Sequence, residues 1–251
     1  MPAPKPPVGS ATQEPTTTTR SHLRSKRKTT SAVNTTIAIY SHATRKQVRD
    51  ATIHDLRHVG LEPEVITIQD APPSQTANRR NAYTALVKAY DGNPVLMLED
   101  DVKPNAHLPA WLTWLERYST TVTTLYAPVG KFYHPAIRPF VEAGTVPPRH
   151  LHGLYTLQGL RGWYGAQAVW IPTQHVEAII NDKLFTIHEH APYGPWDHAI
   201  RSHLQTHQQT MNLVVPNIIQ HRAPRSVVHR TGPRHTTRIF SAAEIPPEGA
   251  S

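Results

Sequence analysis

An eight-residue stretch near the middle of the chain, 95–102, places the strongest constraint on fold and chemistry. It reads VLMLEDDV, so four apolar residues run directly into the carboxylates of Glu99, Asp100 and Asp101. The apolar part is typical of a buried strand, because turn-forming residues flank the stretch on both sides. Burying unpaired carboxylates is very costly. We therefore predict a strand whose end presents acids to a cation or to basic groups; a plain acidic turn is the alternative.

Other segments around this strand alternate between β-rich runs and helical spacing. The β-α-β-α-β order of the first part predicts an α/β fold, a mostly parallel Rossmann-type sheet flanked by helices in a single domain. Open sheets of this kind bind ligands at the carboxyl ends of their strands. Residues 127–160 are expected to be loops that cover the site. The expected strands are 36–40, 65–68, 122–126, 166–171 and 212–215, and the expected helices are 44–59, 76–90, 108–118, 174–180 and 196–204.

The net charge of +8 is concentrated at the two ends of the chain. Residues 1–32 hold six Lys and Arg against one Glu, and residues 222–251 hold five against two, whereas the middle has fifteen of each sign. The first segment is rich in Pro and Thr and has almost no large apolar residue, so we predict a disordered basic tail over 1–32. A folded domain is expected over 33–240 and a loose C-terminal end over 241–251.

Several classes of protein and site are excluded by what the sequence lacks. It has no cysteine, which removes disulfides and thiolate metal sites and is compatible with a reducing compartment. It shows no P-loop, GxGxxG, GxSxG or HExxH motif. No apolar run is long enough for a signal peptide or a membrane span, so we expect a cytoplasmic protein.

Three kinds of side chain are candidates for a metal site and for proton transfer. The acids after the central strand suit Mg²⁺ or Mn²⁺, which bind carboxylates together with phosphate oxygens. His221 follows a β-rich run, and imidazole also binds Mn²⁺-like ions, although a lone His there is often structural. Asp197 opens a predicted helix, where it is either a general base or simply a residue favoured by the helix dipole.

Two further groups of residues suggest a nucleotide site and a sugar site. Ser41, Arg45, Asp70 and Arg79 lie near the ends of the first two strands, and arginine matches the geometry of phosphate oxygens. These four are candidates for holding a diphosphate and a base. The pair Trp163 and Tyr164 could form an aromatic platform for a sugar ring, while core packing is the alternative.

The order of these pieces resembles a known family. The stretch from Leu98 to Val102 resembles the acidic DxD-type motif of GT-A glycosyltransferases. Within that family, further segments are similar, in the expected order, to the N-acetylglucosaminyltransferase I branch, and the resemblance spans about residues 36–225. These segments are Ile68-Gln69-Asp70, Gly162-Trp163, Pro195-Trp196-Asp197-His198, and Pro216 to His221.

The resemblance implies a metal-dependent enzyme that moves a sugar from a nucleotide sugar, a UDP-sugar being favoured, to an acceptor hydroxyl. It implies that Asp101 and His221 bind the metal and that Glu99 and Asp100 lie near the ribose or a metal-bound water. It also implies that Asp197 is the base of an inverting reaction, while a retaining mechanism stays open. The remaining roles follow in the same way: Ser41, Arg45, Asp70 and Arg79 at the donor, and Trp163, Tyr164 and Trp196 at the acceptor.

Alternative functions remain open at the level of the sequence. The acceptor is a protein, a glycan or DNA with hydroxymethylated bases, to which the basic ends would give salt-sensitive binding. A non-catalytic module that binds a metal or a nucleotide sugar is a second alternative. A nucleotidyltransferase is a third, but Ser41-His42-Ala43-Thr44 does not resemble the Gly-rich loop that such enzymes carry after the first strand.

Overall fold

A computed structural model describes most of the chain from residue 33 onward, and residues 31–251 form one compact unit. The predicted tail over 1–32 lies outside the described residues. Among the described helices, none has the length and apolar character needed to cross a membrane. The ranges described are 33–70, 72, 74–127, 130–158, 160, 163, 166–182, 185, 195–222 and 239–248.

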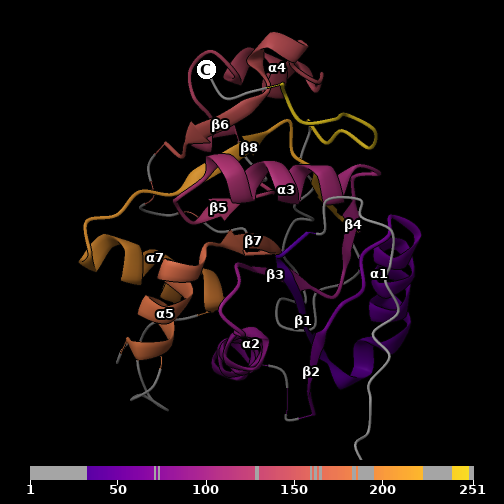
Figure 1. The fold of residues 1–251 in the computed structure, drawn as a ribbon, viewed down its shortest axis with the longest axis vertical. Coiled ribbons are helices and arrows are strands. Elements are labelled where there is room, and N and C mark those ends of the chain that lie inside the picture. Colours follow the sequence, from indigo (N-terminus) through magenta and orange to yellow (C-terminus); the bar gives the residue numbers. More distant parts are fainter. Residues whose placement is uncertain are drawn as a thin grey trace, which may run out of the picture. The chain divides into compact units, whose positions relative to one another are not determined.

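A seven-stranded sheet runs through the described part of this unit in the order β2-β1-β3-β7-β5-β8-β6 (Figure 1). Five of the strands run in one direction, whereas β7 and β6 run against them. The predicted mostly parallel α/β sheet is therefore confirmed. The strands are β1 (Thr36–His42), β2 (Val65–Gln69), β3 (Val95–Glu99), β5 (Thr123–Thr124), β6 (Gly153–Thr156), β7 (Ala168–Ile171) and β8 (Asn212–Val215).

Helices cover both faces of this sheet. Alternate residues of a strand point to opposite faces, and the two hydrophobic clusters follow that alternation. On β3, Val95 and Met97 join a cluster with α2, α5 and α7, whereas Leu96 and Leu98 join a cluster with α1 and α3. The helices are α1 (Lys46–His58), α2 (Gln75–Ala89), α3 (Leu108–Tyr118), α4 (Arg138–Ala143), α5 (Thr173–Asn181) and α7 (Trp196–Thr206).

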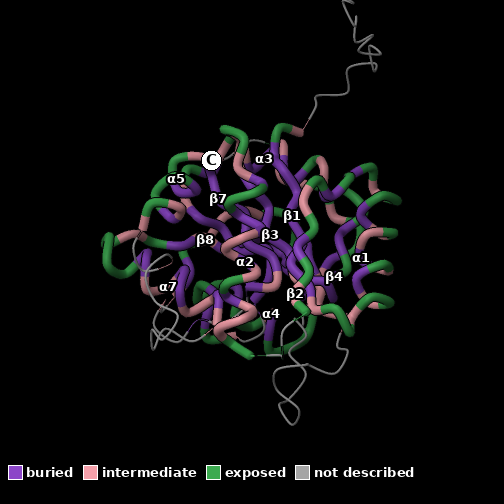
Figure 2. The backbone as a smooth tube through the Cα atoms, turned by 90° about the horizontal axis from the view of Figure 1, so that it is seen from below, coloured by how far each residue is buried: buried purple, intermediate pink, exposed green. Residues whose placement is uncertain are grey.

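The helix α3 shows why these segments become helices that pack on the sheet. Leu108, Trp111, Leu112 and Leu115 follow the i, i+3, i+4, i+7 spacing of a single helix face, and all four are buried. The same division is visible along the described backbone, where the central strands are buried and the helices alternate between buried and exposed residues (Figure 2). Fully burying each such side chain contributes about 1.5–3 kcal/mol.

The structure differs from the sequence prediction in two regions. Residues 127–160 are not only loops: they contain α4, two 3-10 turns, η2 (Gly130–Phe132) and η3 (Arg149–Leu151), and the strand β6 at the edge of the sheet. The segment 241–248, expected to be loose, contacts the start of α3. There Asn105 donates to the carbonyl of Ser241 (2.7 Å), and the indole of Trp111 donates to that of Glu244 (2.8 Å).

A second, two-stranded sheet joins segments that lie far apart in the sequence. β4 (Val102–Pro104) pairs antiparallel with β9 (Ile219–His221), and Val102 lies opposite His221. The amide of Arg222 extends the pairing by donating to the carbonyl of Asp101 (2.7 Å). This small sheet therefore fixes His221 beside the acidic end of β3.

Candidate active site

The acids of the central strand lie at its carboxyl end, as predicted. β1 and β3 are parallel, and their register places Tyr40 beside Glu99. Glu99 is the third residue in the alternation Val95, Met97, Glu99, so its side chain projects on the face covered by α2, α5 and α7. Asp100 and Asp101 follow in the turn toward β4, and both are buried. The three carboxyl groups therefore lie close together at the carboxyl end of β3, largely shielded from solvent.

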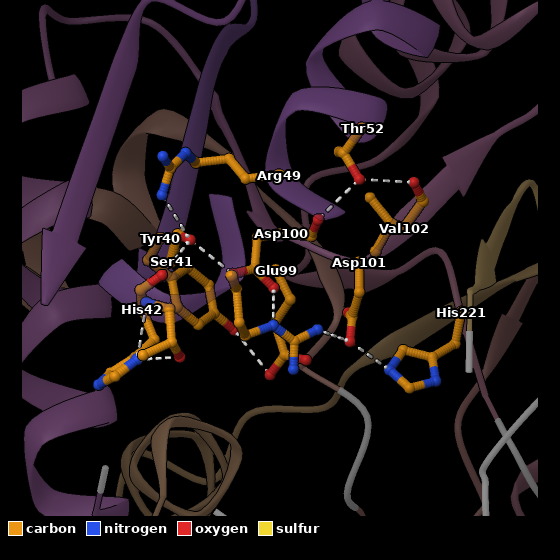
Figure 3. Close-up of polar contacts among 12 residues, drawn as sticks. Tyr40, Ser41, His42, Arg49, Thr52, Glu99, Asp100, Asp101, Val102 and His221 are labelled. Atoms are coloured by element: carbon orange, nitrogen blue, oxygen red, sulfur yellow. Dashed lines mark hydrogen bonds and ion pairs between the residues drawn. The ribbon is translucent and has the colours of Figure 1, made fainter. Parts of the chain in front are cut away.

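Basic and hydroxyl groups from the β1–α1 connection compensate part of this negative charge. Arg45, the last residue of the 3-10 turn η1 (Ala43–Arg45), forms ion pairs with Asp100 (Nε to Oδ1, 2.8 Å) and with Asp101. Ser41 donates a hydrogen bond to Asp100 Oδ2 (2.5 Å) and accepts one from Arg49 (3.2 Å). Figure 3 shows these contacts around Ser41, Asp100 and Asp101. Two of the predicted donor-binding residues, Ser41 and Arg45, thus lie in the acidic site.

His221 contacts Asp101 directly, with Nε2 at 2.9 Å from Oδ2 (Figure 3). Burial lowers the pKa of His221, but the hydrogen bond and the charge of Asp101 outweigh burial and raise this pKa above its ordinary value. Burial likewise raises the pKa of Asp101, and here His221 and Arg45 together bring it below its ordinary value. Asp101 is therefore an ionised, buried carboxylate held between two basic groups.

Glu99 behaves differently from its neighbours. Burial, followed by the nearby charge of Asp101, raises the pKa of Glu99 from 4.5 to about 8. The Tyr40 hydroxyl is 3.3 Å from Glu99 Oε1 and 3.0 Å from the carbonyl of Ala166, and it donates to either oxygen. At neutral pH, Glu99 thus keeps its proton until a cation compensates its charge.

The site fits a divalent cation by the chemistry of its donors. One ligating atom from each of Glu99, Asp101 and His221 lies within 4.8 Å of the other two. Asp101 Oδ1 and His221 Nδ1 are both buried, and neither has a hydrogen-bond partner among the described residues. A buried carboxylate oxygen without a partner is costly, and a bound cation would satisfy it. Glu99, predicted to lie at the donor, therefore joins the two predicted metal ligands.

Asp197 lies on the same side of the sheet as Glu99. It follows Pro195 in the first turn of α7, and α7 packs in the cluster that includes Tyr40 and Met97. The pKa of Tyr40 is raised well above its ordinary value by burial and then by the charges of Glu99 and Asp197. Asp197 is therefore close enough to act electrostatically on a hydroxyl that touches the acidic site.

The environment of Asp197 suits a proton acceptor. Its Oδ1 accepts a hydrogen bond from the backbone amide of His198 (2.9 Å), which fixes the carboxylate at the helix start. Burial raises the pKa of Asp197, and the charges of His198 and Arg201 partly oppose this. A raised pKa makes the carboxylate a stronger base than an exposed aspartate.

Two other predicted donor residues lie outside this cluster of contacts. Asp70 is exposed directly after β2, at the same edge of the sheet but on the far side of β1. Arg79 is buried within α2, and burial lowers its pKa. Asn81, also in α2, donates a hydrogen bond to the carbonyl of Ser41 (2.8 Å) and so links this helix to the end of β1.

The predicted aromatic platform is not an open surface. Trp163 is 0% exposed and Trp196 is 1% exposed, and both indoles belong to the core cluster that includes α2 and α7. This burial favours core packing, the alternative to an aromatic platform, and the acceptor role of Trp163 and Trp196 stays a prediction. Tyr164 lies outside the described residues.

Three residues of the site were missed by sequence reasoning. Tyr40 lies in a strand that is buried on both faces, so it looked like a core residue. Thr52 of α1 places its hydroxyl 2.8 Å from the Asp100 carbonyl and 3.0 Å from that of Val102, which fixes the acidic turn (Figure 3). Arg222 donates to the Val102 carbonyl (3.0 Å) and forms an ion pair with Asp55. No local sequence pattern marks the last two.

Comparisons with known proteins give no family assignment from sequence. No family model matches the chain, and no curated protein matches it. Among solved structures, it is similar to a mutant Drosophila β-1,4-galactosyltransferase 7 in complex with manganese, UDP-Gal and xylobiose (TM-score 0.45, 13% identity, covering 76% of this chain and 72% of that one). It is also similar to a glycosyltransferase involved in glycosylation of the major capsid of PBCV-1 (TM-score 0.42, 10% identity, covering 79% and 96%). Both TM-scores are below 0.5, and neither likeness assigns the chain to a family.

Proposed function

We propose that this protein is a GT-A-type glycosyltransferase that uses Mn²⁺ or Mg²⁺ to transfer a sugar from a nucleotide sugar to an acceptor hydroxyl. The supporting observation is the meeting of Glu99, Asp101 and His221 at the end of β3, on the sheet face where Asp197 begins α7. A cation site and a candidate base on one face of an α/β sheet suit a reaction in which a diphosphate departs and a hydroxyl attacks.

Asp101, His221 and Glu99 are the residues that would hold the cation. When bound, such a cation acts as a Lewis acid that stabilises the charge of the departing nucleoside diphosphate. The donor set of two carboxylates and one imidazole favours Mn²⁺ over Mg²⁺, because Mg²⁺ prefers oxygen ligands.

Arg45 is the residue best placed to hold the donor diphosphate. It compensates the charges of Asp100 and Asp101 through two ion pairs. Once a cation compensates these carboxylates, the guanidinium becomes available to phosphate oxygens, which it matches in geometry. We assign the nucleotide of a UDP-sugar to the adjoining edge of the sheet, where Asp70 and Arg79 lie near the end of β2.

Asp197 is proposed as the general base of an inverting reaction. Its carboxylate accepts the proton of the acceptor hydroxyl while that oxygen attacks the anomeric carbon, and the bond from this carbon to the diphosphate oxygen breaks. The backbone amide of His198 orients the carboxylate, and burial raises its pKa, so the base is both fixed and strengthened.

A panel of nucleotide sugars tests the proposal, with release of free nucleotide measured with and without Mn²⁺. We expect turnover on at least one UDP-sugar, loss of turnover in excess chelator, and loss in Asp101→Asn. Asp50→Asn is the matched control, because Asp50 is an exposed aspartate of α1 that pairs only with Lys46 in the described structure. Full turnover in Asp101→Asn, or of the wild-type protein in excess chelator, would refute the proposal that catalysis needs a cation bound at Asp101.

A further inference from the structure

A second cluster of metal-binding side chains lies at the other end of α7 from Asp197. His203 lies in the last turn of α7 and His207 is the C-cap of this helix, and their ring centroids are 4.6 Å apart. Both approach the same carboxylate oxygen, Oδ2 of Asp182, which directly follows α5. His203 Nδ1 is 2.5 Å from this oxygen and His207 Nε2 is 3.6 Å from it. Two imidazoles and a carboxylate therefore converge on one point.

A simple hydrogen bond explains only part of this arrangement. The bond from His203 to Asp182 accounts for one imidazole, whereas 3.6 Å is too long for a second hydrogen bond from His207. His203 is 1% exposed, and its ring centroid lies 4.6 Å from that of His207, so the two imidazoles lie side by side at this carboxylate. One hydrogen bond therefore leaves the approach of His207 to Asp182 unexplained.

We propose that Asp182, His203 and His207 bind a transition-metal ion of the Zn²⁺ type, which fastens the end of α5 to the last turns of α7. Zinc takes nitrogen and carboxylate ligands in a tetrahedral arrangement, whereas Mg²⁺ and Ca²⁺ prefer oxygen ligands alone. Two imidazoles with one carboxylate therefore select against the latter ions. Three protein ligands leave a coordination position for water or another group.

The distances within the cluster are compatible with such an ion after a small movement. Metal-ligand bonds of about 2.0–2.1 Å in a tetrahedral site place neighbouring ligand atoms about 3.3 Å apart. The 3.6 Å separation of His207 from Asp182 is already close to that value. The 2.5 Å contact of His203 must open by somewhat less than 1 Å, and rotation of the Asp182 side chain at the end of its helix can supply this.

Zn²⁺ titration of the full chain tests the proposal, with Asp101→Asn as the background so that the site at β3 does not contribute. We expect one Zn²⁺ per chain by calorimetry and no competition from Mg²⁺. His207→Gln and Asp182→Asn should each weaken Zn²⁺ binding at least about tenfold, because loss of a mere outer-shell partner of a ligand already costs about 10–100-fold. The matched control is His54→Gln, which removes an exposed histidine that faces a single carboxylate, Asp55, at 3.4 Å.

Thermal stability gives a second readout that does not depend on any transferase activity. At a Zn²⁺ concentration about 100 times the dissociation constant, Tm should rise by about 5–10 °C in the background protein and in His54→Gln. The rise should be lost in His207→Gln, whose half-exposed ring can be replaced without opening the core. Equal Zn²⁺ binding in His207→Gln and His54→Gln would overturn the proposal, as would the absence of any Zn²⁺ site in the background protein.

Discussion

The pH dependence of Mn²⁺ binding follows from the position of Glu99. Burial and the charge of Asp101 raise the pKa of Glu99 to about 8, so the carboxyl group is protonated at neutral pH. A metal ligand must lose its proton on binding. One proton is therefore displaced from Glu99 at every pH below about 8, and the apparent affinity falls about tenfold for each pH unit below that value. Between pH 8, where Glu99 is already half protonated, and pH 6 this amounts to a loss of about 50-fold.

His221 contributes a second proton to the pH dependence of Mn²⁺ binding, in addition to the proton of Glu99. Its pKa is raised by Asp101, so it also releases a proton to a metal at pH values below that raised pKa. In Glu99→Gln, residue 99 has no titratable proton, so metal binding no longer releases one from this position. The plot of log Kd against pH should then become less steep, by about one log unit per pH unit across pH 6–8, even though the overall affinity for Mn²⁺ is weaker.

Mn²⁺ binding can be followed by electron paramagnetic resonance of the free ion at several pH values. Glu64→Gln is the matched control, because the pKa of Glu64 is also raised by burial but Glu64 lies outside the acidic site. The reasoning is refuted if the wild-type affinity does not change between pH 6 and pH 8. It is also refuted if Glu99→Gln keeps the full wild-type slope.

Three further changes test other parts of the account. Thr52→Val removes the hydroxyl that satisfies the buried carbonyls of Asp100 and Val102, and it should lower the free energy of unfolding by about 1–3 kcal/mol in urea denaturation, whereas Thr52→Ser should not. Truncation after Phe240 removes the contacts of 241–248 with α3 and should lower stability by a similar amount; no change would restore the expectation of a loose end. Deletion of 1–32 removes almost no apolar side chain, so Tm by scanning calorimetry should stay unchanged.

Regular elements with clear periodicity could be predicted from the sequence. The first three strands and the two helices between them were placed within a few residues, because apolar runs and helical spacing are local signals. The acids of Glu99, Asp100 and Asp101 were equally visible, since they interrupt an apolar strand. Their ion pairs with Arg45 were not predicted, although both groups lie at the edge where parallel strands end.

Contacts made by very short strands could not be predicted in this way. β4 and β9 have three residues each and pair across more than a hundred residues of chain, so neither shows a period. Their pairing nevertheless puts His221 on Asp101. Burial of aromatic residues was similarly ambiguous, because Trp163 and Trp196 look the same in a sequence whether they line a surface or fill a core.

Removing the charge of Asp197 tests the central claim most directly. The variant is measured in a sugar-transfer assay and, in parallel, by calorimetry of nucleotide-sugar binding. Asp197→Asn keeps the shape of the side chain and removes the proton acceptor. A positioned base contributes about 10²–10⁴-fold in rate, so we predict that sugar transfer falls within that range while the affinity for the nucleotide sugar with Mn²⁺ stays within about twofold of the wild type. An equal fall in donor affinity would place Asp197 at the nucleotide, and no change in either quantity would leave it as a helix-start residue; both results contradict the account.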